Sequence, residues 1–139
     1  MNTIKYRKLK LEAGQLLLDM GCGEGRHSIG ALLETPANVI GIDLSFEDLN
    51  TAKSRLNDFD LSGHDTFCTF GVGDIKNIPI ENASLDAVMC SEVLEHVDSP
   101  KESIQELVRV LKPGGIMALS GTRYLPEINC WKLRKEYSK

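Results

Sequence analysis

The feature that most constrains the fold is an apolar run that leads directly into three glycines at alternate positions. Residues 16–25 read LLLDMGCGEG. Glycines at this spacing reach backbone angles closed to other residues, and without a Cβ they let a ligand approach the main chain. Ile29, Leu32 and Leu33 recur at helical spacing, so the turn leads into a helix whose first amides point at the turn. The segment predicts a strand, a glycine turn and a helix that together form a cradle for an anionic or zwitterionic small molecule.

Five short apolar runs have the length of buried strands, and helical stretches separate them. A chain of 139 residues, 42% of them hydrophobic, fits one globular domain. The alternation of strands and helices predicts parallel strands joined by crossover helices, which is an α/β fold. The predicted strands cover residues 16–19, 39–43, 67–72, 85–91 and 116–120.

Two helices carry clear start signals. Ser99 precedes Pro100 and Glu102, which places an N-cap serine, a proline at the first helical position and a glutamate at the third, as in a capping box. A KPGG sequence closes that helix, and Ser45 is expected to cap a second one. The apolar stripe of the first is Ile104, Leu107, Val108 and Leu111, and that of the second is Phe46, Leu49, Ala52 and Leu56.

Composition excludes several other classes of protein. No apolar run approaches the roughly 20 residues of a membrane span, and no signal-peptide stretch follows the basic N-terminus, so a cytoplasmic protein without a membrane partner is expected. The four cysteines are scattered without a CxxC pair, which disfavours zinc and a disulfide framework. Both ends of the chain are basic around an acidic middle, but the net charge is −4, and no strong nucleic-acid signal results.

Acidic and polar residues stand at the ends of four predicted strands. In an open parallel sheet, ligands bind beyond the carboxyl ends of the strands, where the strand order reverses. Asp19, Asp43 and Asp74 each lie at or just beyond the end of a separate strand, and so does the pair Ser91 and Glu92. The sequence therefore predicts one crevice that receives polar groups from four strands.

The spacing of these residues indicates which ligand the crevice takes. Asp43 follows Gly25 by 18 residues, where an acid can accept hydrogen bonds from both ribose hydroxyls. A dinucleotide fingerprint that starts at Gly21 would need glycine at position 26, where Arg26 stands instead. The carboxylate of Asp19 would repel a pyrophosphate but would favour an amino group or a sulfonium. A nicotinamide dehydrogenase is therefore disfavoured.

These segments together resemble a class I S-adenosylmethionine-dependent methyltransferase of the type 11 group. The resemblance runs in the expected order from about residue 14 to residue 120. It implies a Rossmann-like, doubly wound parallel sheet with strand order 3-2-1-4-5, and S-adenosyl-L-methionine as the cofactor. The matching segments are LLLDMGCGEGRHS (16–28), VIGIDLS (39–45), GDIKNIPIENASLDAVMCSEVLEHV (73–97) and LVRVLKPGGIMALS (107–120).

The resemblance also implies a role for each matching residue. The methionine end would lie against Asp19 and the glycine turn, the ribose on one acid, and the adenine against an apolar side chain and a second acid. Ser91 would lie near the sulfonium. The implied cofactor-binding residues are Asp19, Gly21, Cys22, Gly23 and Gly25 for methionine, Asp43 for ribose, Leu44, Asp74 and Ile75 for adenine, and Ser91.

His96 is the candidate catalytic residue. It follows the fourth strand on the side where an acceptor would lie, and a general base is needed if the acceptor must lose a proton. Glu92, Glu95 and His96 form ExxEH, which resembles the partial metal-binding set of the small-RNA 3′-end methyltransferases. A third interpretation is that Glu95 and His96 only shape the turn after the strand, so all three roles stay open.

The end of the chain departs from the resembled family. Only 19 residues follow Ser120, whereas the family continues into a helix and two antiparallel strands, the sixth and seventh. We therefore expect one partial domain over residues 1–139, with a tail at 121–139 that lacks those strands. The fifth strand would then be an open edge that invites self-association.

The predicted function is methyl transfer to an unidentified acceptor. A small molecule is the expected acceptor, and an incomplete fragment would retain mainly cofactor binding. The alternative is a non-catalytic nucleoside-binding or interaction module of the same fold, because doubly wound sheets host many chemistries.

Overall fold

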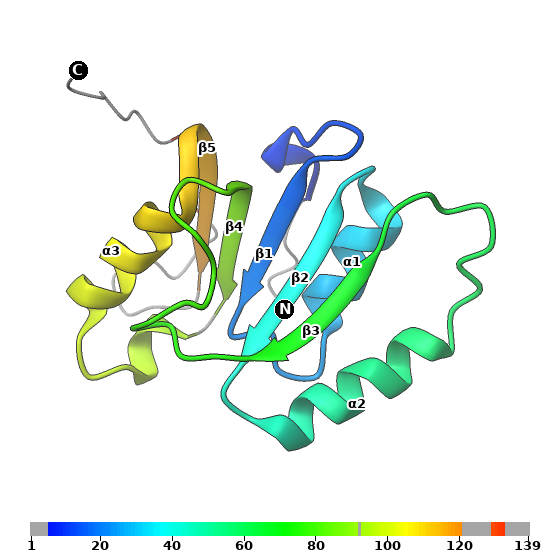
Figure 1. Ribbon diagram of the computed structural model, residues 1–139, viewed down its shortest axis with the longest axis horizontal. Coiled ribbons are helices and arrows are strands. Elements are labelled where there is room, and N and C mark those ends of the chain that lie inside the picture. The colour runs from blue at the N-terminus through cyan, green and yellow to red at the C-terminus, as the bar shows by residue number, and fades with distance from the viewer. Residues whose placement is uncertain (1–5, 92, 121–128, 133–139) are drawn as a thin grey trace.

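The protein is built around one six-stranded sheet (Figure 1). The structure, a computed structural model, describes residues 6–91, 93–120 and 129–132. The strand order is β3-β2-β1-β4-β5-β6, in which the first five strands are parallel and β6 is antiparallel to β5. The predicted order 3-2-1-4-5 is thus confirmed. The strands are β1 (Leu16–Met20), β2 (Asn38–Asp43), β3 (Cys68–Val72), β4 (Leu85–Ser91), β5 (Leu111–Ser120) and β6 (Asn129–Lys132).

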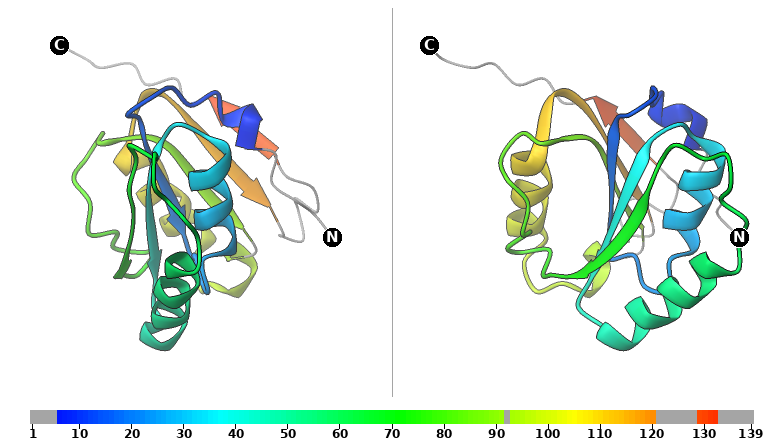
Figure 2. Two further views of the ribbon diagram at one scale, coloured as in Figure 1. Left: turned by 90° about the vertical axis from the view of Figure 1, so that its right-hand side faces the viewer. Right: turned by 45° about the vertical axis from the view of Figure 1, so that its right-hand side comes forward.

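Helices cover both faces of the sheet. Figures 1 and 2 show α1 (Arg26–Glu34) and α2 (Phe46–Asn57) on one side and α3 (Pro100–Val110) on the other. Two short 3-10 helices, η1 (Tyr6–Leu9) and η2 (Leu94–His96), complete the described elements. Of the helices in the described residues, none is both long and apolar enough to cross a membrane.

The core lies on both faces because neighbouring side chains of a strand point in opposite directions. Leu17 packs with Leu32 of α1, whereas Leu18 packs with Leu107 of α3, and all four side chains are buried. Burial on both faces explains why the strands read as continuous apolar runs rather than as alternating patterns.

The predicted helix starts are confirmed. Ser99 Oγ accepts a hydrogen bond from the Glu102 amide at 3.4 Å, and Ser45 Oγ accepts one from the Asp48 amide at 3.1 Å. Pro100 is the first residue of α3. A backbone N–H at this position would have no carbonyl partner within the helix, so proline costs the helix no hydrogen bond there.

Two assignments at helix ends were wrong. Leu111 was predicted as the last residue of the α3 stripe, but it has extended backbone angles and pairs with Leu85 at the start of β5. Phe46 was predicted to share one apolar face with Leu49 and Ala52, but it stands at the first position of α2 and is 65% exposed. Leu49 and Ala52 of the same stripe are buried as predicted.

The expected open edge at β5 was also wrong. Residues 116–119 of β5 pair antiparallel with β6, so the tail of the chain itself supplies an antiparallel strand there. The tail was predicted to lack both antiparallel strands of the family, and β6 corrects this because it is one antiparallel strand. The other residues of the tail, 121–128 and 133–139, lie outside the described residues. Self-association through β5 therefore loses its structural basis, because the backbone groups of these residues are already paired.

Candidate functional site

A cavity of about 530 Å³ lies beyond the carboxyl ends of the parallel strands. It begins at Met20, the last residue of β1, and the strand order reverses between β1 and β4. This is the place where open parallel sheets bind ligands, and the volume lies within the usual range of small-molecule pockets. Six of the predicted cofactor-binding residues line it, as does the candidate base His96: Gly21, Asp43, Leu44, Asp74, Ile75 and Ser91.

Asp43 connects the cavity to the glycine turn. Its Oδ2 accepts a hydrogen bond from the Gly23 amide at 2.8 Å, and its Oδ1 accepts one from the Ser45 amide at 2.9 Å. A carboxylate has about four lone-pair positions, so both oxygens keep capacity for further donors. The side chain is thus held in one orientation at the cavity wall, where two neighbouring hydroxyls of a ligand could reach it.

The glycine turn uses its amides within the protein. The amides of Gly21 and Cys22 both donate to the Ile42 carbonyl, at 2.7 and 3.0 Å, and the Gly23 amide donates to Asp43. These amides were expected to hold the methionine end of a ligand, but in the structure they join the turn to β2. Of the turn residues that were predicted to bind the cofactor, Gly21 lines the cavity, whereas Cys22, Gly23 and Gly25 do not.

Gly21 and Gly25 are held where a side chain would not fit. Gly21 has φ +76°, and a Cβ there would collide with the side chain of Val93. Gly25 caps α1 with φ +85°, and a Cβ there would lie 2.9 Å from the Ala52 Cβ of α2. At Gly21 and Gly25 the turn therefore packs against the segment after β4 and the middle of α2, with no space for a side chain at either position.

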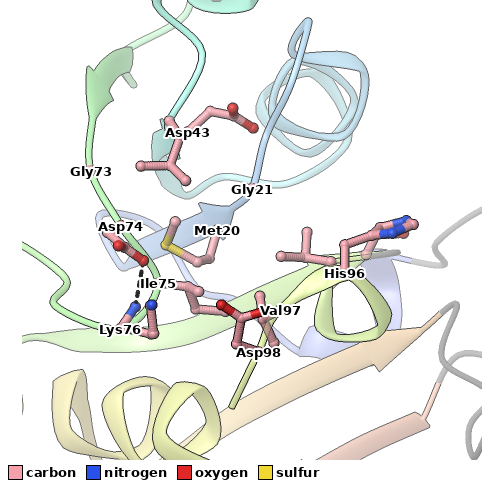
Figure 3. A pocket seen from close by; sticks show the side chains of 13 residues that line it. Met20, Gly21, Asp43, Gly73, Asp74, Ile75, Lys76, His96, Val97 and Asp98 are labelled. Atoms are coloured by element: carbon pink, nitrogen blue, oxygen red, sulfur yellow. Dashed lines mark hydrogen bonds between the residues drawn. The ribbon is translucent and has the colours of Figure 1, made fainter. Parts of the chain in front are cut away.

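Asp74 and Ile75 line the cavity together with Leu44. The Asp74 Oδ1 accepts a hydrogen bond from the Lys76 amide at 2.9 Å, which fixes the carboxylate at the start of a turn. Ile75 is buried in the core beside α3, and Leu44 is exposed. Figure 3 shows Asp43 and Asp74 on one side of the cavity and His96 on the other. A flat ring bound in the cavity could place polar atoms of its edge against the carboxylates of Asp43 and Asp74.

Asp19 lies beneath the turn and not in the cavity lining. It is 2% exposed, and its Oδ2 accepts a hydrogen bond from Ser28 Oγ at 2.6 Å. Burial raises the pKa of Asp19 from 3.8 to about 6, and the negative charge of Asp43 adds to this, while the bonds from Ser28 oppose it. The carboxyl group therefore changes charge near neutral pH.

The free energy of unfolding should reflect this titration. Asp19 binds a proton more tightly in the folded chain than in the unfolded chain, so its contribution is fully present below about pH 4 and is lost as the pH rises through about 6. A shift of about 2 pH units corresponds to about 3 kcal/mol. Urea unfolding of the wild type and of Asp19→Asn between pH 4 and 8 measures the difference. We expect the variant to gain relative stability across that window, and parallel curves would contradict the assignment.

Burial disfavours the thiolate form of three cysteines, of which Cys22 and Cys90 are buried and Cys68 is partly buried. Burial raises the pKa of Cys22 far above its ordinary value, and it raises the pKa of Cys68 and Cys90 to about 12. A protonated thiol is a poor nucleophile and a poor metal ligand. Cys22 is thus a packing residue beside Phe70, and it does not line the cavity.

The end of β4 and the segment after it bring the Ser91 hydroxyl and His96 to the cavity. Ser91 Oγ lies 2.8 Å from Ser120 Oγ at the end of β5, and His96 lies in η2 and lines the cavity. Glu92 and the side chain of Glu95 lie outside the described residues, so the candidate metal set stays a prediction. Among the side chains that the structure describes, no three metal-ligating groups gather.

Part of the cavity wall was missed by the sequence analysis. Lys76 follows the predicted adenine residues directly, and Asp98 follows His96 by two positions. Val93 and Val97 flank η2 and close the same side. Only their position after a strand could have predicted them, because segments that follow neighbouring parallel strands meet at one edge of the sheet.

A cavity at the point where the order of parallel strands reverses is typical of α/β proteins that bind a small ligand at the strand ends. The chain belongs to the methyltransferase domain family, whose model matches residues 18–119. That match covers the sheet from β1 to β5 and every described wall of the cavity.

Curated relatives agree with this assignment. The chain is 39% identical to the ubiquinone biosynthesis O-methyltransferase of Dechloromonas aromatica, over 78% of its own length and 44% of that protein. It is 34% identical to the 27-O-demethylrifamycin SV methyltransferase of Amycolatopsis mediterranei, over 85% of its own length and 42% of the relative. The chain thus spans less than half the length of these relatives.

Solved structures share the fold at similar identity. A SAM-dependent methyltransferase from Methanosarcina mazei superposes with a TM-score of 0.74 at 27% identity, over 86% of this chain and 57% of that one. The [4+2]-cyclase SpnF superposes with a TM-score of 0.73 at 28% identity, over 81% of this chain and 40% of that one.

Proposed function

We propose that this chain is the cofactor-binding part of an S-adenosylmethionine-dependent methyltransferase. The observation that carries the proposal is the convergence of Asp43, Asp74 and Ser91, each at or just beyond the end of a separate strand, on one cavity. Asp43 would accept both ribose hydroxyls, and Asp74 would accept the exocyclic amino group of adenine. Such hydrogen bonds to charged acceptors are about twice as strong as neutral ones.

The remaining cofactor contacts follow from the shape of the cavity. Leu44 and Ile75 would cover the adenine ring, and Ser91 would lie near the sulfonium. The methionine end would reach the glycine turn at Gly21, with the charge of Asp19 acting from beneath it. A bound S-adenosylmethionine supplies an electrophilic methyl group with a good leaving group, so the protein's task is to orient an acceptor in line with it.

The acceptor we propose is a small molecule. The names of the relatives support this, because ubiquinone biosynthesis and demethylrifamycin both denote small organic substrates. His96 is the candidate general base for an acceptor that must lose a proton, and its place across the cavity from Asp43 supports that role. The non-catalytic alternative is less favoured, because both of these curated relatives are named as methyltransferases.

Calorimetric titration of the folded chain tests the proposal. S-adenosylmethionine and S-adenosylhomocysteine should each bind, whereas NAD should not, because Arg26 occupies the position of the third fingerprint glycine. A ligand at 100 times its dissociation constant should also stabilise the fold by about 2.7 kcal/mol. Absence of adenosylhomocysteine binding by folded protein would overturn the cofactor assignment. Transfer of a radiolabelled methyl group to small-molecule extract fractions would then test the enzymatic step.

A further inference from the structure

The segment between β3 and β4 forms part of the cavity wall without being regular structure. All of residues 73–84 are described, and no helix or named strand occurs among them. Asp74 and Ile75 nevertheless project from this segment to the cavity. An irregular segment keeps a fixed shape only where other parts of the protein bind its backbone groups.

Arg109 of α3 binds the backbone of this segment at several points. Its Nη2 donates to the Ile78 carbonyl and its Nη1 donates to the Ile80 carbonyl, both at 2.8 Å. Nη1 also donates to the Asn82 Oδ1 at 2.8 Å. One planar side chain therefore binds three alternate residues of the segment, at positions 78, 80 and 82.

Glu106 holds Arg109 and adds a bond of its own. The Arg109 Nε donates to Glu106 Oε2 at 2.5 Å, and Nη2 donates to Oε1 at 3.0 Å, which makes the pair bidentate. Oε1 also accepts a hydrogen bond from the Ile78 amide at 2.9 Å. The pair thus binds both the amide and the carbonyl of Ile78, between the cavity residues and β4.

The pair is better suited to fixing a shape than to raising overall stability. The side chains of Arg109 and Glu106 are 31% and 17% exposed, and ion pairs near the surface contribute little to the free energy of unfolding. A guanidinium presents its donors in a rigid fork that lysine lacks, so the contact to two carbonyls and one carboxylate requires arginine. Ile78, the residue held most tightly, follows Asp74 by four positions and is buried in the core.

We propose that Arg109, oriented by Glu106, is a positioning residue for the adenine side of the cavity. Its bonds to Ile78 and Ile80 fix the 73–84 segment in the shape that places Asp74 and Ile75 against the edge of a bound adenine. This inference rests on the proposed function, because it assigns Asp74 to adenine. It predicts that Arg109 affects ligand affinity through Asp74, separately from any effect of its substitution on the stability of the fold.

A double-mutant cycle with S-adenosylhomocysteine as the probe tests this coupling. Arg109→Met should weaken binding by about 10-fold in the wild-type background, which lies within the range of energies measured for coupled residues. In an Asp74→Asn background the same change should alter affinity by no more than about 2-fold. Calorimetry at a temperature where circular dichroism shows every variant folded provides the affinities.

Lys112→Met is the matched control. It removes the same charge just beyond α3, and Lys112 contacts Asp86 and not the 73–84 segment, so affinity should not change. If Arg109→Met does not fold, Glu106→Gln carries the test, because it weakens the orientation of Arg109 and should show the same dependence on Asp74.

Two results would overturn the inference. Equal losses from Arg109→Met in both backgrounds would show that Arg109 acts independently of Asp74, and an unchanged affinity would show that it does not act on the site. If the wild type itself does not bind S-adenosylhomocysteine, the proposed function fails and the inference fails with it. A wild type that binds, with no effect of Arg109→Met, removes only the inference.

Discussion

Asp43→Asn should weaken the binding of S-adenosylhomocysteine by about 100-fold. Hydrogen bonds to a charged acceptor contribute about 1.5 to 3 kcal/mol each, so the weakening of two ribose contacts amounts to about 3 kcal/mol. The change also disturbs hydrogen bonds within the protein. The carboxylate accepts the amides of Gly23 and Ser45 on different oxygens, and an asparagine presents an NH2 group to one of them. Calorimetric titration of the folded variant measures the affinity.

Asp60→Asn is the matched control for that variant. Asp60 Oδ1 accepts the Ser62 amide at 3.0 Å, two residues ahead, just as Asp43 accepts Ser45. Asp60 lies in an exposed loop that does not line the cavity. Its variant should bind the ligand with wild-type affinity, and equal losses in the two variants would show that the effect of Asp43 is a general effect of charge.

Gly21→Ala should lower the free energy of unfolding by about 3 kcal/mol. Left-handed backbone angles cost a residue with a Cβ about 1 to 2 kcal/mol, and overpacking a filled site costs about 1 to 3 kcal/mol more. Both apply at Gly21, which has φ +76° and whose added methyl would collide with Val93. Because Val93 lines the cavity, any relief of the collision would also move the cavity wall. Urea unfolding measures the loss.

Two other glycines separate the strain from the collision. Gly14 has φ +81° with open space around it, so Gly14→Ala should cost about 1 kcal/mol from strain alone. Gly71 in β3 has neither a positive φ nor a close neighbour, and its alanine variant should lose no stability to strain or collision. A Gly21→Ala variant no less stable than Gly14→Ala would contradict the close approach of Val93.

Local patterns made much of this fold predictable. Caps such as Ser45 and Ser99 depend on residues three positions away, so a short window of sequence contains the whole interaction. The cavity acids were also predictable from the sequence. Asp43 ends one parallel strand and Asp74 follows another, and the ends of such strands meet at one edge of the sheet. Their predicted roles toward a ligand stay predictions until binding is measured.

What escaped prediction depends on contacts between distant segments. Leu111 suits a buried helix position and a buried strand position equally well, and only its pairing with Leu85 decides between them. The bonds of the Gly21 and Cys22 amides to Ile42 depend on how closely β2 approaches the turn. The pairing of β6 with β5 likewise joins segments whose sequences give no sign of each other.

The bonds from the glycine turn to Ile42 and Asp43 have a consequence for how tightly the site can bind. The chain itself holds the turn in one shape, since the amides of Gly21, Cys22 and Gly23 donate to Ile42 and Asp43 of β2. A site that is ordered in advance loses little conformational entropy when a ligand enters. We therefore expect the preorganisation of the turn to contribute to the affinity of a ligand at this edge of the sheet.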